Sequence, residues 1–319
     1  MTSEKLRLLI GKDALRMLKE TFSDENIKKT FKAQYKTRNL IPVRECVYDC
    51  LMQSYRIKFG NALEEIYKDL LTESTSYTLV KNITSKLPLD DEKFCKKLGI
   101  EPVTDNLCRG GGQTVFVISK RNLDLFTNYI NDCTCKNPDT ISIKDRFNKL
   151  VDEVKNNIKE EVINPFAYEF LVFKNDVDLF FFNKEKFYYV ELKKEDNHDS
   201  DKTDSMYGKA LKTFLCMFYQ AYANDDPTLK IEGTFINMSL SFFGEIKTKS
   251  KILPEDYVFS GQQFFNKFMD ISYDDFVDIV DEIRESTEMR NCIKECRNKV
   301  ENFPDEELEK IKESLKKSA

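Results

Sequence analysis

The chain has 319 residues, which is long enough to bury a sizeable hydrophobic core in one large or two modest domains. Its 50 basic and 55 acidic residues give a formal net charge of −5, which excludes a strongly basic protein that coats nucleic acid without sequence preference. A single histidine excludes hydrolase mechanisms that need several, and no glycine-rich phosphate-binding motif is present.

The cysteines and the apolar runs indicate in which cellular compartment the protein is expected. Nine cysteines are an odd number, and none of their spacings matches a zinc site. No apolar run approaches the roughly 18 residues that span a membrane, and the N-terminal segment is too interrupted for a signal peptide. We therefore expect a cytoplasmic protein with reduced thiols and no membrane contact.

Residues 1 to about 75 are predicted to be helical. Pro42 is suited to the first turn of one helix, and a second helix is expected to start near Gly60, with an apolar stripe along one side. Glu64 lies beside that stripe, with Glu65 next to it. The carboxylate of Glu64 therefore either borders a functional site or faces solvent as an ordinary charge.

The next part of the chain mixes turn, helix and strand signals. A short helix is expected to start at Asp90 and Asp91 and to end at Gly99, because acidic residues favour a helix start and glycine a helix end. Arg109, three glycines and Gln113 then lead into a strand over 115–118. The glycines permit either a plain flexible turn or a close approach of the backbone to another surface. Two amphipathic helices are expected to follow, over about 122–130 and 143–161.

Two runs rich in aromatic and β-branched residues, 177–182 and 187–193, predict adjacent strands. Only the polar residues 183–186 separate them, which favours a hairpin. The hairpin would bring Asp178, at the start of the first strand, close to Glu191 and Lys193 at the end of the second. Side chains alternate along a strand, so Glu191 and Lys193 should emerge on the same face.

This cluster predicts a functional site, because apolar central strands seldom carry ionisable groups without a use. Two carboxylates offer hard oxygen ligands for Mg²⁺, which would polarise the phosphoryl oxygens of a phosphodiester. Lys193 is expected to stay charged beside them, to stabilise the transition state and to orient the attacking water. The simpler alternative is an exposed salt bridge between Asp178 and Lys193. We rank a second Glu-x-Lys pattern at 245–247 lower, because the aspartates upstream of it, Asp225 and Asp226, precede a proline turn and not a strand.

A polar segment over 195–204, which includes His198, is expected to form a loop after the hairpin. A strong helix should follow over about 205–223, with Lys209 and Lys212 on one side of its first half. The remaining elements are expected in this order: a strand within 231–240, a strand and helix over 258–265, and a capped C-terminal helix over 304–317.

The arrangement of Asp178, Glu191 and Lys193 on a strand hairpin resembles the PD-(D/E)XK nuclease superfamily and, within it, the type II restriction endonucleases. Val177 stands where that family often has proline. The helix that carries Glu64 and the segment over 258–276 are weaker similarities. The resemblance extends from Gly60 to Phe276, and only the hairpin motif within it is specific.

The resemblance implies an α/β fold with a restriction-endonuclease-like PD-(D/E)XK core, in which helices flank a mixed central sheet of four or five strands. Helical additions are expected at both ends, so we divide the chain into an N-terminal helical region (1–54), a nuclease core (55–250) and a C-terminal helical region (251–319). It further implies Mg²⁺-dependent, sequence-specific cleavage of double-stranded DNA by a homodimer, and a companion methyltransferase for the same site.

The resemblance also implies roles for individual residues. Glu64 would complete the metal site, with Glu65 as its alternative. Lys209 and Lys212 would contact phosphates, although solubilising charge explains them equally well. The implied metal ligands are Asp178, Glu191, the carbonyl of Leu192 and Glu64, and the candidate DNA contacts are Arg109, Gln113, Lys209 and Lys212.

Two other functions fit the same sequence. A nuclease of this fold that reads DNA structure, in repair, recombination or defence, would not cut plasmid DNA at fixed positions. A catalytically inactive DNA-binding protein that keeps the fold would be unaffected by Lys193→Ala.

Overall fold

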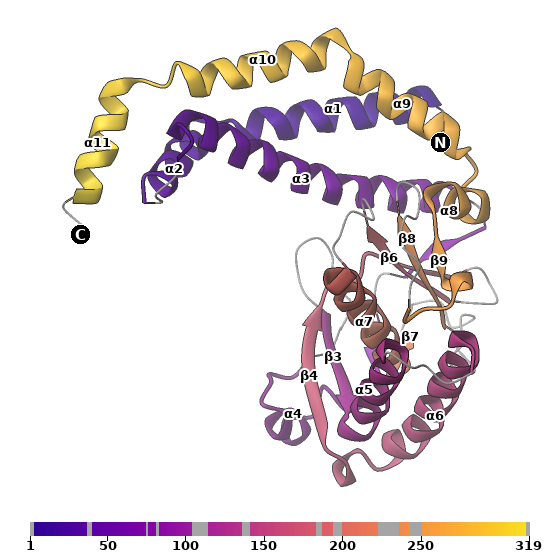
Figure 1. Cartoon of the computed structure of the whole chain (residues 1–319). Coiled ribbons are helices and arrows are strands. Elements are labelled where there is room, and N and C mark those ends of the chain that lie inside the picture. The colour runs from indigo at the N-terminus through magenta and orange to yellow at the C-terminus, as the bar shows by residue number, and fades with distance from the viewer. Residues whose placement is uncertain are drawn as a thin grey trace. The chain divides into compact units, whose positions relative to one another are not determined.

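The computed structural model describes residues 3–36, 40–74, 76–80, 83–103, 114–135, 141–182, 187–193, 200–222, 236–242 and 251–316. Two compact units are present. The helical unit contains Met1–Leu70 and Ile271–Ala319, and the sheet unit contains Leu71–Asp270 (Figure 1). Both ends of the chain therefore belong to one unit. The three-part division with boundaries after residues 54 and 250 remains a prediction.

The helical unit is built on one apolar core shared by helices from both ends of the chain. Its helices are α1 (Ser3–Thr21), α2 (Asp24–Gln34), α3 (Val43–Glu73), α9 (Tyr273–Glu285), α10 (Thr287–Glu301) and α11 (Asp305–Lys316). Leu18, Phe22 and Phe31 are fully buried in this core, which also receives side chains of α3, α10 and α11. Ser272 and Ser286 cap α9 and α10 by accepting backbone N–H bonds.

Helix α3 is continuous from Val43 to Glu73, so the prediction that a new helix starts near Gly60 is wrong. A glycine inside a helix costs about 1 kcal/mol relative to alanine. The helix absorbs this cost because strong apolar contacts flank the glycine: Leu51, Leu63 and Ile66 are all buried.

A five-stranded mixed sheet dominates the sheet unit, in the order β1-β5-β6-β8-β9. Its strands are β1 (Thr78–Leu79), β5 (Leu179–Phe182), β6 (Phe187–Lys193), β8 (Ile236–Phe242) and β9 (Val258–Phe259). Strands β5 and β6 pair antiparallel, with Leu179 opposite Val190 and Phe182 opposite Phe187, which confirms the predicted hairpin. Strand β8 is parallel to β6 and also to β9.

Helix α7 (Ser200–Met217) follows β6 in the chain and packs against both β8 and β3. It starts inside the segment predicted as a loop and ends before Ala223, so both predicted boundaries are wrong. The cause is strand pairing, because β7 (Gln220–Tyr222) pairs with β2 (Ile83–Ser85) and takes those residues out of the helix.

The rest of the sheet unit covers these strands. It comprises α4 (Glu92–Leu98), β3 (Thr114–Ser119), α5 (Lys120–Thr134), α6 (Ile143–Ile163), β4 (Phe170–Asn175), α8 (Gly261–Phe268) and two 3-10 turns, Pro165–Ala167 and Glu255–Tyr257. Strands β3 and β4 form their own antiparallel pair. Asp91 caps the start of helix α4 and the left-handed Gly99 caps its end, in agreement with the predicted start at Asp90 and Asp91 and end at Gly99. None of the helices in the part of the chain that the structure describes has the length and apolarity to cross a membrane.

Candidate active site

Asp178 lies next to the end of β6, as the hairpin predicts. It precedes β5 by one residue, and continuing the strand register by one position sets it opposite Glu191. Its carboxylate oxygen Oδ2 accepts a hydrogen bond of 2.7 Å from the backbone N–H of Leu192. Asp178 is half-buried, whereas only 6% of Glu191 is exposed. The two acidic residues therefore share one end of the hairpin.

The backbone carbonyl of Leu192 faces the same edge as Asp178. The carbonyl of Phe180 accepts from the backbone N–H of Val80, the residue directly after β1, so the backbone groups of its neighbour Leu179 face β6. The N–H and C=O groups of one strand residue point to the same neighbouring strand. Since the Leu192 N–H reaches Asp178, the Leu192 carbonyl is also directed toward the edge that lies just before β5 begins.

A buried tyrosine holds the carboxyl group of Glu191. The phenol of Tyr189 donates a hydrogen bond of 2.8 Å to Oε2 of Glu191, its neighbour two residues along on the same face of β6. Burial raises the pKa of Tyr189 well above its usual value, and the negative charges of Glu191 and Asp178 raise it further, while a hydrogen bond with Thr213 acts in the opposite direction. The phenol therefore keeps its proton at neutral pH and remains a donor.

Thr213 of α7 and Asn175 at the end of β4 extend this polar cluster. Both are buried, and the Asn175 side-chain amide donates to the Thr213 hydroxyl at 2.8 Å. The Thr213 hydroxyl also donates to the backbone carbonyl of Lys209 at 3.0 Å. The sequence interpretation missed Tyr189, Thr213 and Asn175. Tyr189 had a usable signal, since it shares the face of Glu191, but Thr213 and Asn175 sit in patterns typical of a helix and a strand end.

The other predicted site residues are only partly placed. Lys193 is the last residue of β6, and the structure describes its backbone alone. Glu64 is half-buried in α3 and belongs to the helical unit, while Glu65 is exposed and pairs with Lys68. Their roles remain predictions. The following lie outside the described residues: Arg109, Gln113, His198 and the second Glu-x-Lys pattern at 245–247.

Lys209 and Lys212 differ in their surroundings, although both lie on α7. Lys209 is exposed. Lys212 is half-buried, and its ammonium lies 4.5 Å from the centre of the Phe173 ring, a cation–π contact. Lys209 is therefore the better placed of the two for a contact with a phosphate.

The oxygen atoms at the hairpin end fit a magnesium ion. Within the described ranges, no group of three His, Cys, Asp or Glu side chains is arranged to hold a metal. Mg²⁺ does not require such a group, because it commonly binds through one or two carboxylates and keeps several waters. Asp178, Glu191 and the Leu192 carbonyl supply this kind of oxygen set.

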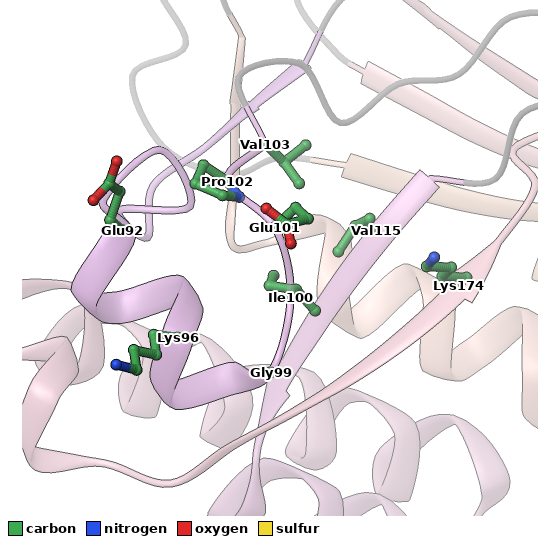
Figure 2. A pocket seen from close by; sticks show the side chains of 9 residues that line it. All are labelled: Glu92, Lys96, Gly99, Ile100, Glu101, Pro102, Val103, Val115 and Lys174. Carbon is green, nitrogen blue, oxygen red and sulfur yellow. The ribbon is translucent and has the colours of Figure 1, made fainter.

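A separate cavity of about 730 Å³ lies between α4 and the β3–β4 pair (Figure 2). Neither Asp178 nor Glu191 lines it. Its charged lining residues are Glu92, Lys96, Glu101 and Lys174. Because this lining mixes both signs of charge, it offers no surface of one sign for a phosphate backbone, and the hairpin end remains the candidate site.

Comparison with known proteins gives two matches. Residues 107–284 match the family model described as "Type II restriction endonuclease, HinfI". The "Type II restriction enzyme HinfI" of Haemophilus influenzae is 25% identical over 288 residues, which cover 89% of this chain and 93% of that protein. No solved structure matches. The family match contains Asp178, Glu191 and the whole of α7, but it does not contain Glu64.

Proposed function

The chain belongs to the HinfI family of type II restriction endonucleases, and we propose that it hydrolyses phosphodiester bonds of double-stranded DNA at a specific sequence with the help of Mg²⁺. One observation carries the proposal: the carboxylate of Asp178 accepts a hydrogen bond from the backbone of Leu192, next to Glu191 at the end of β6. These residues lie inside the part of the chain that matches the family. Two acidic side chains at one strand end suit metal-assisted hydrolysis better than structural packing.

The residues at the hairpin end divide the chemistry between them. Asp178, Glu191 and the Leu192 carbonyl hold the Mg²⁺ ion, which when bound polarises the scissile phosphate and offsets charge on the leaving oxygen. Lys193, two residues beyond Glu191, orients the attacking water and stabilises the negative charge that develops on the phosphoryl oxygens. Hydrolysis leaves a 5′-phosphate on one product end.

The order of elements supports a PD-(D/E)XK core. An antiparallel hairpin, β5–β6, carries the acidic residues, and a crossover that contains helix α7 and the short strand β7 leads to the parallel strand β8. Arg109, Gln113, Lys209 and Lys212 contact the DNA. The enzyme acts as a homodimer in the cytoplasm, since cutting both strands of a symmetric site needs two centres related by a two-fold axis. A methyltransferase protects the same sequence in the host.

Incubation of the purified protein with unmethylated phage DNA tests this proposal. With Mg²⁺, a gel should show discrete fragments, and a chelator should abolish them. Lys193→Ala should lose cleavage by roughly a thousandfold, because it removes the charge that stabilises the transition state, while binding to the DNA persists. Fragments without discrete sizes would indicate a nuclease that does not read sequence, and a lack of cleavage at any divalent ion concentration would refute the proposal.

A further inference from the structure

The hydrogen bond between Tyr189 and Glu191 is unusual because it joins two groups on one buried face of a central strand. Tyr189 is fully buried and Glu191 nearly so. Burying a polar pair costs free energy that apolar residues would not cost, and β6 is otherwise filled with aromatic and aliphatic residues. Such a pair is expected where the orientation of a carboxyl group matters.

We propose that Tyr189, supported by Thr213 of α7, is a positioning residue that fixes the orientation of the Glu191 carboxyl group for the divalent ion. This inference rests on the proposed function, since it assumes that Glu191 is a metal ligand. Partners that hydrogen-bond to metal ligands fix the ligand's orientation, and their removal typically lowers metal affinity or activity about 10- to 100-fold.

The geometry favours a rigid support. A glutamate has three rotatable side-chain bonds, so an isolated carboxyl group samples several directions. The bond of 2.8 Å from Tyr189 to Oε2 selects one of them. Tyr189 cannot shift easily, because its side chain is fully enclosed in the core.

The same cluster reaches the second acidic residue through β4. Asn175 donates to Thr213 and lies three residues before Asp178. Asn175 ends β4 and Thr213 belongs to α7, so their hydrogen bond joins the strand that precedes the site to the helix that covers it.

Titration with Mn²⁺ measures this effect directly, because the electron paramagnetic resonance signal of the free ion reports binding without DNA cleavage. Tyr189→Phe removes only the phenol oxygen and should raise the dissociation constant for Mn²⁺ roughly tenfold. Thr213→Val, which leaves the phenol in place, should raise it by a smaller factor. The Mg²⁺ concentration for half-maximal cleavage should rise in parallel, with activity recovered at high Mg²⁺.

Tyr129→Phe is the matched control. Tyr129 is also buried in the sheet unit, and its phenol donates to the backbone carbonyl of Ile252 and not to the site. A general loss of a buried tyrosine hydroxyl should lower stability in both variants, whereas only Tyr189→Phe should weaken Mn²⁺ binding. In a Glu191→Gln background, Tyr189→Phe should have no further effect on Mn²⁺ binding, because the charged carboxylate that Tyr189 orients for the ion is already removed.

Each outcome separates the positioning role from the nuclease assignment. Equal Mn²⁺ dissociation constants for the wild type and Tyr189→Phe would overturn the positioning role, while fragments from the wild type would keep the proposed function. If Asp178→Asn leaves Mn²⁺ binding unchanged, the ion binds elsewhere in the protein. That result would also overturn the positioning role of Tyr189. If Tyr189→Phe does not fold, unchanged Mn²⁺ binding by a folded Thr213→Val protein gives the same negative answer.

Discussion

Two regions of the sheet unit each bury a glutamate that accepts a hydrogen bond from a buried tyrosine, but their surroundings differ. Glu161 of α6 is fully buried and accepts from Ser119 at 2.7 Å, from Asn122 at 3.3 Å and from the phenol of Tyr219. Glu191 accepts from Tyr189 and lies beside Asp178 at a strand end. Neutral hydrogen-bond donors from three parts of the chain surround the carboxyl group of Glu161, whereas a second acidic residue, Asp178, lies beside Glu191.

This difference separates a structural role from a functional one. The donors to Glu161 come from the end of β3, from helix α5 and from the residues after α7. The carboxyl group of Glu161 therefore links these elements by hydrogen bonds. Asn157 adds a bond of 2.7 Å to Asn122 in the same network. Two acidic residues beside each other repel unless a cation lies near them. Burial of a carboxyl group alone is therefore no argument for a catalytic site, and the proposed role of Glu191 depends on its acidic neighbour Asp178.

Glu191→Gln should produce the largest effect. The substitution keeps the shape and one oxygen for Tyr189 but removes the negative charge that holds the ion. Cleavage should fall by roughly a thousandfold, while the free energy of unfolding changes by only about 1 kcal/mol. Fragment formation under single-turnover conditions and urea unfolding measure the two quantities. A variant that cleaves at the wild-type rate would remove Glu191 from the site.

Glu161→Gln should show the opposite pattern. One oxygen becomes an amide group that cannot accept from Ser119, and the bonds to Asn122 and Tyr219 lose strength. The free energy of unfolding should fall by about 2 kcal/mol, while cleavage per folded molecule and Mn²⁺ affinity stay unchanged. A large loss of Mn²⁺ affinity without a loss of stability would mean that both glutamates serve the site, and the distinction between the two regions would fail.

Lys209→Ala tests whether the exposed side of α7 contacts DNA, as proposed for the site around Glu191. Loss of one phosphate contact should weaken DNA binding a few-fold and reduce the slope of log affinity against log salt by about 1. Lys149→Ala is the control, because Lys149 is an exposed lysine on α6, the helix that carries Glu161. Fluorescence anisotropy at several salt concentrations measures both slopes. Equal slopes for the two variants and the wild type would rule out a phosphate contact at Lys209.

Glu307→Gln should have the smallest effect, because this glutamate lies on the surface of the helical unit. Hydrogen bonds from Lys28 and Lys310 lower the pKa of Glu307 from 4.5 to about 2. A carboxylate whose pKa is lower in the folded state stabilises the protein above its unfolded pKa and loses that effect as pH falls toward the folded value. The small stability difference between variant and wild type should be constant above about pH 4.5 and disappear near pH 2. Thermal unfolding across this range, at low salt, measures it.

The sequence by itself determined the hairpin, the approach of Asp178 to Glu191 and the caps of α4. These features depend on alternation along a strand, on a short turn and on residues at helix ends, and such signals act within a few positions of the chain. The mixed sheet of four or five strands was implied by the family resemblance, and strand β1 (Thr78–Leu79), which lies at its edge, had no signal in the sequence. The family resemblance depended on Asp178, Glu191 and Lys193, whose positions on the hairpin are predicted from these local signals.

Only the tertiary structure decided the partners of those residues. Thr213 meets Asn175, and Glu161 meets Tyr219, across 38 and 58 residues of chain. The end of α7 was set by pairing of β7 with β2, and the continuity of α3 through Gly60 by buried contacts on both sides. Hydrogen bonds and packing between distant segments leave no periodic signal in the sequence, because each residue meets its partner only after the chain has folded.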